Sequence, residues 1–133
     1  MSRITVAAKI DSLPSLLAFV KKEAGGAGFD EKTANEVQLA FEEAVVNVIN
    51  YAYPGTEGSV DVETSAGAEG LAIVISDSGI AFDPLSMPEP NINAPLEERK
   101  VGGLGVYMFR RIMDKVSYKR EGGRNILTLV KNK

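Results

Sequence analysis

The feature that most constrains the fold is a long run of apolar residues at helical spacing between residues 31 and 53. Its apolar positions recur at intervals of three and four residues: Val37, Ala40, Phe41, Ala44, Val45, Val48 and Ala52. This spacing predicts one long amphipathic helix, which Asp30 is suited to cap and Pro54-Gly55 to end. Because such a helix buries its apolar stripe against another element, the rest of the chain must supply a sheet or further helices.

The segments on either side of this helix predict a sheet. The further predicted elements are strands at 3–10, 59–65, 71–76, 116–121 and 124–131, a helix from Ser12 to the glycines of 25–28, and a helix at 104–114. Gly122-Gly123 predicts a hairpin turn between the last two strands. We expect an α+β two-layer sandwich, with a mixed, mostly antiparallel sheet and helices on one face, forming a single domain over 1–133. The apolar segment 71–76 is expected to be central and buried on both faces.

The absence of cysteine and histidine limits the chemistry that this sequence can carry. It excludes disulfides, thiolate or histidine zinc sites, Ser-His-Asp triads and phosphohistidine, so a general base must be Asp, Glu, Lys or Tyr. A net charge of −3 argues against direct nucleic-acid binding. Because no apolar run approaches the roughly 20 residues of a membrane span and no signal-peptide core is present, we expect a cytoplasmic protein without membrane contact.

Three local patterns are candidates for a binding site. Glu43 and Asn47 lie one turn apart on the long helix, beside its apolar stripe, where an acid and an amide suit a hard cation. Asp77-Ser78-Gly79 follows the apolar strand, and Gly102-Gly103-Leu104-Gly105 opens a helix whose free N–H groups suit phosphate. Each pattern alone is more often a solvated helix flank, a strand-ending turn or a plain loop. Between them, 84–101 carries four prolines and no periodicity, which is typical of a functional lid.

The three patterns in this order resemble the GHKL ATPases, the superfamily of DNA gyrase B subunits and histidine kinases, which has the Bergerat ATP-binding fold. Segment 41–47 (FEEAVVN) is similar to the N box of that superfamily, 77–83 (DSGIAFD) to its D-x-G box, and 103–108 (GLGVYM) to its G-x-G phosphate loop. Segments 43–53 (EAVVNVINYAY) and 103–114 (GLGVYMFRRIMD) further resemble the small anti-sigma factor serine/threonine kinases, the RsbW-like branch.

The resemblance implies ATP and Mg²⁺ as cofactors and phosphotransfer to a protein Ser or Thr hydroxyl. It implies that Glu43 is the catalytic base, Asn47 holds the Mg²⁺ ion, and Asp77 binds the adenine amino group. The other implied nucleotide contacts are Gly79, Phe82 and the backbone of Gly103, Leu104, Gly105 and Val106. The implied partners are a sigma factor, a STAS-domain anti-anti-sigma protein and a second copy of the chain.

The sequence departs from the branch at several positions. Tyr51 stands where a histidine is frequent, and Gly102 stands where an arginine is common, with Arg99 or Lys100 as substitutes toward the γ-phosphate. The late threonine of the superfamily falls near Asn125 or at Thr128.

Two alternatives to a kinase stay open at this stage, namely a nucleotide-gated binding switch without phosphotransfer and a purely structural domain. A homodimer would use the strand Ile4–Ile10 and the apolar face of the following helix, with Leu13, Leu16, Leu17 and Val20, unless this helix covers its own sheet.

Overall fold

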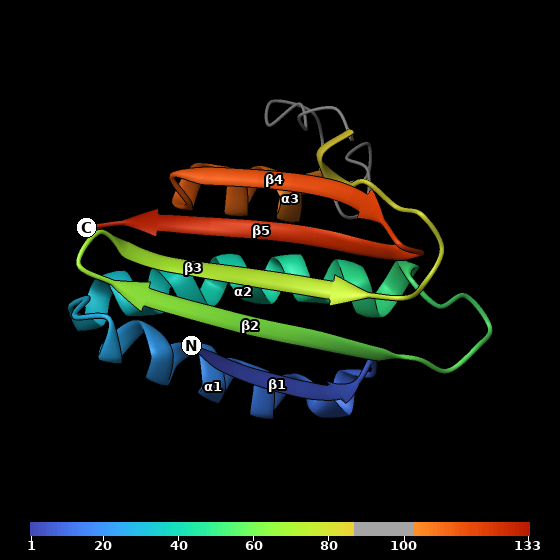
Figure 1. Cartoon of the computed structure of the whole chain (residues 1–133), viewed down its shortest axis with the longest axis horizontal. Helices are drawn as coiled ribbons and strands as arrows, with labels where there is room; N and C mark the ends of the chain where they lie inside the picture. Colours follow the sequence, from blue (N-terminus) through green and yellow to red (C-terminus); the bar gives the residue numbers. More distant parts are fainter. Residues whose placement is uncertain (87–102) are drawn as a thin grey trace.

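The computed structural model describes residues 1–86 and 103–133, which form a five-stranded sheet with helices packed on one face (Figure 1). The strands are β1 (Ser2–Ala7), β2 (Ser59–Gly67), β3 (Gly70–Asp77), β4 (Lys115–Glu121) and β5 (Arg124–Asn132). The helices are α1 (Leu13–Gly26), α2 (Glu31–Tyr51) and α3 (Gly103–Ile112), with short 3₁₀ turns η1 (Ile10–Ser12) and η2 (Pro84–Ser86). Within these residues, none of the helices has the length and apolar character needed to cross a bilayer.

The order of the strands in the sheet is β1-β2-β3-β5-β4, and each of these neighbouring pairs is antiparallel. The predicted two-layer α+β class is confirmed. The predicted turn at Gly122-Gly123 is also confirmed, because both glycines have positive φ angles, +60° and +74°, as a tight hairpin turn requires. The register places Asp77, the last residue of β3, directly opposite Asn125 near the start of β5.

The long helix lies where the periodicity predicts, although it ends at Tyr51, two residues early. Asp30 caps it, since its side-chain Oδ1 accepts a hydrogen bond from the Thr33 backbone N–H at 2.8 Å. Val37, Phe41 and Val45 are fully buried in the core, as the apolar stripe requires. α2 packs between α1 and α3, so it is the central element of the helical layer.

The prediction that 71–76 is buried on both faces is wrong. Burial alternates along β3: Leu71, Ile73 and Ile75 are buried against the helices, whereas Ala72 and Val74 are only half-buried. The physical reason is that every helix described here lies on the same side of the sheet (Figure 1). The helices within residues 1–86 and 103–133 therefore leave the opposite face uncovered.

Of the two alternatives for the first helix, the one in which it covers the chain's own sheet is confirmed. Leu16 and Val20 have no exposed surface and belong to the core, while Leu13 and Leu17 are half-buried against the same core. An amphipathic helix next to an apolar sheet face buries its stripe there before it can offer it to a second copy. Among the described strands, β1 pairs with β2 alone and lies at an edge of the sheet.

Candidate nucleotide-binding site

Asn47 lies on α2, on the side that faces the sheet. Its side chain was predicted to lie beside the core, but only 5% of the residue is exposed. The side-chain Nδ2 donates a hydrogen bond to the backbone oxygen of Glu43 at 3.2 Å. Because the nitrogen arm of the amide is held by the helix in this way, the oxygen arm is the end that a ligand can use. A neutral amide oxygen is a ligand that Mg²⁺ accepts.

Glu43 lies one turn before Asn47 and is half-buried. Burial raises the pKa of the Glu43 carboxyl above its ordinary value, and the neighbouring charge of Glu42 adds to this shift. A carboxylate with a raised pKa accepts a proton more readily, which is the property that a general base needs.

Asp77 ends β3 with 3% of its surface exposed. Its Oδ1 accepts hydrogen bonds from the backbone N–H of Gly79 at 2.8 Å and from the side-chain Nδ2 of Asn125 at 2.9 Å. Both donors meet the same oxygen of the carboxylate. The second oxygen, Oδ2, is therefore the acceptor that remains for a ligand.

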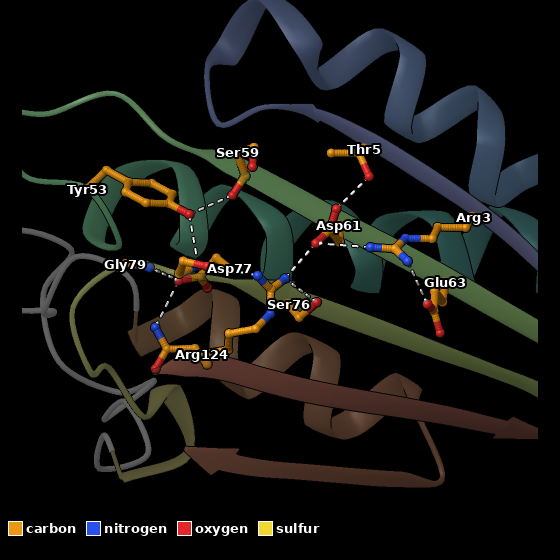
Figure 2. Close-up of polar contacts among 12 residues, drawn as sticks. Arg3, Thr5, Tyr53, Ser59, Asp61, Glu63, Ser76, Asp77, Gly79 and Arg124 are labelled. Atoms are coloured by element: carbon orange, nitrogen blue, oxygen red, sulfur yellow. Dashed lines mark hydrogen bonds and ion pairs between the residues drawn. The ribbon is translucent and has the colours of Figure 1, made fainter. Parts of the chain in front are cut away.

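The turn after Asp77 is pressed against the C-terminal end of α2. A Cβ atom on Gly79 would lie 2.1 Å from the backbone oxygen of Ala52, and that oxygen accepts a hydrogen bond from the Ile80 N–H at 2.9 Å. Figure 2 shows Tyr53 reaching the same turn, where its hydroxyl accepts from the Ser78 N–H at 2.9 Å and donates to the Ser59 carbonyl. Only glycine allows this approach at position 79.

A narrow pocket separates α2 from the sheet at this end of the molecule. Its walls come from α2, β3, β4, β5 and the turn after β3: Ala44, Asn47, Val48, Ala52, Ile75, Asp77, Phe82, Pro84, Tyr118, Asn125 and Leu127. The pocket encloses about 20 Å³, which is room for about one water molecule. The Phe82 ring, one of its walls, stacks on Tyr51 with ring centroids 5.1 Å apart. A purine ring can enter only if such a wall moves aside.

The predicted phosphate loop is the first turn of α3, because the helix begins at Gly103 and includes Gly105. The first N–H groups of a helix have no partner within it, so this turn presents donors suited to an anion. α3 packs against α2, which places this turn in the helical layer together with Asn47. The structure describes the backbone of 103–107. Arg99, Lys100 and Gly102, and the predicted lid from residue 87 onward, lie outside the described residues.

The structure brings together residues that the sequence did not connect. Asn125 lies opposite Asp77, whereas Thr128 lies opposite Val74, three residues before Asp77 on β3. Of the two positions expected for the late threonine of the superfamily, the one near Asn125 is therefore the one beside the site. Tyr118 and Arg120 come from the edge strand β4. The Arg120 guanidinium donates to the Gly79 carbonyl at 2.8 Å. Their roles depend on strand register, for which the sequence carries no local signal.

A metal ion at this site would depend on the nucleotide. In the part of the chain that the structure describes, no three His, Cys, Asp or Glu side chains cluster as metal ligands would. Mg²⁺ often takes only one or two protein ligands and completes its shell with phosphate oxygens and water. The side-chain oxygen of Asn47 fits this kind of site.

The fold is an α+β sandwich, and a small, mostly apolar pocket with a few buried polar side chains lies between its central helix and its sheet. Comparison with known proteins identifies the family to which this fold belongs. The family profile of the histidine kinase-like ATPase domain matches residues 6–131, and the chain belongs to this family.

Similar proteins include serine-protein kinases named RsbW. The chain is 27% identical to the RsbW of Bacillus cereus strain G9842 over 104 residues, and 29% identical to that of Listeria monocytogenes over 111 residues. It is 30% identical over 92 residues to the serine/threonine-protein kinase BtrW of Bordetella bronchiseptica. The matches cover 75%, 79% and 68% of this chain, and 65%, 71% and 65% of those proteins. The chain thus spans less than two thirds of the Bacillus and Bordetella relatives.

Solved structures agree on the fold. The RsbU and RsbW domains of a Mycobacterium tuberculosis protein match 98% of this chain and 32% of their own, with a TM-score of 0.63 at 15% identity. The histidine kinase AdeS of Acinetobacter baumannii matches 99% of this chain and 68% of its own, with a TM-score of 0.53 at 11% identity. The resemblance to the RsbW-like branch is therefore confirmed by its relatives, and the Bergerat fold by its structural neighbours.

Proposed function

We propose that the chain is an ATP-dependent protein serine/threonine kinase that also binds a sigma factor. The observation that carries this proposal is the convergence of Asn47 and Asp77 on one pocket, with Glu43 one turn away on the same helix. An amide oxygen for Mg²⁺, a carboxylate oxygen for the adenine base and a proton acceptor for the hydroxyl substrate are three of the groups that phosphotransfer from Mg-ATP can use. The relatives named as serine-protein kinases support the same reaction.

In this proposal Asp77 accepts a hydrogen bond from the adenine amino group through its second carboxylate oxygen, Oδ2. The side-chain oxygen of Asn47 binds the Mg²⁺ ion, whose charge would offset that of the phosphates. The first turn of α3, Gly103 to Val106, donates backbone N–H groups to phosphate oxygens, and Arg99 or Lys100 reaches the γ-phosphate. Glu43 orients the substrate hydroxyl and takes its proton as the oxygen attacks the γ-phosphorus, whose bond to the β,γ-bridging oxygen breaks to release ADP.

The substrate and partners rest on the family resemblance. We propose that the phosphorylated hydroxyl belongs to a serine of a STAS-domain anti-anti-sigma protein, and that two copies of the chain form a homodimer. We also propose a cytoplasmic location and a single histidine-kinase-like ATPase domain over 1–133.

The decisive experiment compares Glu43→Gln with its neighbour Glu42→Gln in an assay with labelled ATP and a STAS-domain protein. Glu43→Gln keeps the size of the side chain but removes the proton acceptor. It should therefore bind ATP as the wild type does and lose phosphotransfer by about 100-fold or more. Glu42→Gln removes an adjacent charge of the same kind and should retain phosphotransfer. Full activity in the Glu43→Gln chain would rule out Glu43 as the base.

The Asn47→Ala chain tests the nucleotide site itself. It should lose the part of ATP affinity that depends on Mg²⁺, measured by calorimetry with and without the ion. A wild-type chain that binds ATP but transfers no phosphate to any STAS-domain protein would favour the nucleotide-gated switch over the kinase.

A further inference from the structure

A second and larger groove lies on the outer side of the turn after β3. It is lined by residues between 52 and 56, which follow α2, by the turn 78–80 and by Arg120 of β4. It holds about 390 Å³ of space that is open to solvent, against about 20 Å³ in the pocket beside Asp77. The turn is a wall of both, because the Gly79 N–H donates to Asp77 and the Gly79 carbonyl accepts from Arg120. The groove therefore lies next to the nucleotide site but outside it.

Hydrogen bonds hold the two sides of this groove together. The Ile80 N–H donates to the Ala52 carbonyl at 2.9 Å, and the Ser78 N–H donates to the Tyr53 hydroxyl at 2.9 Å. The Tyr53 ring lies against Gly58, where a Cβ atom would be 2.1 Å from the ring. Because the loop after α2 and the turn after β3 are joined in this way, a ligand can bind without first having to order them.

Ile80 exposes a large apolar side chain in this groove. The residue is 56% exposed, although Ala52, which accepts its backbone hydrogen bond, is buried. Pro54 and Tyr53 line the same groove. Single exposed apolar residues are common on protein surfaces, but here the side chain lines a preformed groove together with a proline and an aromatic ring. The groove thus offers a contact for an apolar side chain of a ligand.

The charged side chain that lines the groove is a cation. Arg120 is exposed, and its guanidinium uses one of its several N–H donors on the Gly79 carbonyl at 2.8 Å. Among the described residues, no carboxylate lies within ion-pair distance of Arg120. The other donors of a guanidinium can form a two-point contact with a carboxylate. In a chain of net charge −3, this edge of the groove therefore favours an acidic group.

We propose that this groove is a docking site for a protein partner, and that it takes a segment in which Asp or Glu lies one or two residues from Leu, Ile or Val. The aliphatic side chain packs on Ile80, Tyr53 and Pro54, and the carboxylate binds Arg120. The spacing follows from the structure, because Arg120 is bound to the carbonyl of Gly79, the residue directly before Ile80. One or two residues of extended chain, roughly 3.5–7 Å, separate two such contacts.

A segment of protein chain fits this groove better than a small molecule does. Small-molecule sites enclose most of their ligand, whereas this groove is open to solvent. Protein interfaces combine an apolar centre with a polar rim, which is the arrangement of Ile80 and Arg120. The inference concerns a surface outside the nucleotide site, so it is tested separately from the proposed phosphotransfer.

The test begins with a phage-displayed library of random peptides of about 12 residues, selected on the wild-type chain. We expect the enriched sequences to share an aliphatic residue with an acidic residue one or two positions away. The most enriched sequence is synthesised with a fluorescent label, and its dissociation constant is measured by fluorescence anisotropy. A second synthetic peptide carries Lys in place of the acidic residue.

Three variants of the chain locate the bound peptide. Ile80→Asp removes the apolar contact and Arg120→Glu reverses the charge, so each should weaken binding of the acidic peptide by about 10-fold or more. Lys119→Glu is the matched control, because it reverses a charge on the neighbouring residue, whose side chain points to the other face of β4 and pairs with Glu121. It should bind the peptide within about twofold of the wild type. Circular dichroism and calorimetry with ATP check the fold and the nucleotide site.

The lysine peptide separates docking from a change in the turn. Arg120→Glu also removes the hydrogen bond to the Gly79 carbonyl, so weaker binding of the acidic peptide would also follow from a loosened turn. A direct contact makes a further demand, since the lysine peptide should bind Arg120→Glu at least about fivefold more tightly than it binds the wild type. A loosened turn would weaken the binding of both peptides.

Three results would overturn the inference. The first is a library that yields no enriched sequence with the expected pair of residues. The second is an enriched peptide that binds Ile80→Asp and Arg120→Glu as tightly as the wild type. The third is a lysine peptide that does not gain affinity for Arg120→Glu. A wild-type chain that binds the acidic peptide but not ATP would refute the proposed function and support the docking site.

Discussion

Replacement of Gly79 by alanine tests how tightly the turn after β3 is held against α2. The new Cβ would lie 2.1 Å from the Ala52 backbone oxygen, 2.6 Å from its carbonyl carbon and 2.7 Å from its Cβ. An ordinary contact of about 3.5 Å requires a displacement of about 1.4 Å. These neighbours include backbone atoms of the end of α2, which cannot swing away as a flexible side chain would. The shift must also break the hydrogen bond from the Ile80 N–H to the Ala52 oxygen.

Overpacking of this kind costs about 1–3 kcal/mol, and the lost hydrogen bond about 1 kcal/mol. We therefore expect Gly79→Ala to lower the free energy of unfolding by about 2–4 kcal/mol, which moves the urea midpoint down by about 1–2 M. Gly25→Ala is the matched control, because a Cβ there meets nothing within 4 Å and the residue lies in α1. It should raise stability by about 0.5–1 kcal/mol. Gly79→Ala with the wild-type midpoint would refute the close approach of this turn to α2.

Three further predictions concern charge and burial. Burial and the charge of Glu42 raise the pKa of Glu43 above its ordinary 4.5, so the ionised form of this side chain is disfavoured in the folded chain. At pH 7 the Glu43→Gln chain should therefore have a higher free energy of unfolding than the wild type. This advantage should vanish in urea titrations below pH 4.5. Burial alone would raise the pKa of Asp61, but hydrogen bonds from Thr5 and Arg124 outweigh it and lower this pKa below 3.8. Asp61→Asn should therefore destabilise the chain at neutral pH, by an amount that shrinks as the pH falls through the lowered pKa. Leu16→Glu places a carboxylate in the core and should unfold the chain, which circular dichroism would show as a loss of helical signal. A Leu16→Glu chain that stays folded and only becomes monomeric would contradict this.

The parts of the fold that were predictable are those that local sequence encodes. The helical spacing of apolar residues predicts α2, and Asp30 marks its start as the capping residue. The pair Gly122-Gly123 predicts the last hairpin turn, in which both glycines have positive φ. The same helix places Glu43 and Asn47 one turn apart whatever the rest of the chain does. The spacing of apolar residues shows which face of α2 is buried. How deeply the residues beside that face are buried depends on how the sheet packs against the helix. This is why Asn47 is more deeply buried than expected.

The remaining features depend on contacts between distant segments. Asn125 and Tyr118 carry no motif, and they reach Asp77 only because β5 pairs with β3 in one register, with β4 at its far side. The apolar run at 71–76 gives the hydrophobicity of β3 but not the number of layers that cover it. Likewise, the leucines of α1 show an apolar stripe without showing whether it meets the chain's own sheet or a second copy. In both cases the answer lies in the assembly of the layers.

Two consecutive residues of β5, Arg124 and Asn125, connect the site to the uncovered face of the sheet, because both bind the turn after β3. Successive side chains of a strand point to opposite faces, so Arg124 and Asn125 hold the turn after β3 from the two sides of the sheet. Asn125 binds Asp77 on the helical side, while the Arg124 guanidinium donates to Ser78 Oγ at 2.8 Å and to the Asp61 carboxylate on the open side (Figure 2). A turn held from both faces presents a fixed acceptor before any ligand arrives. The movement that a purine needs must therefore come from the other walls of the pocket, and not from Asp77.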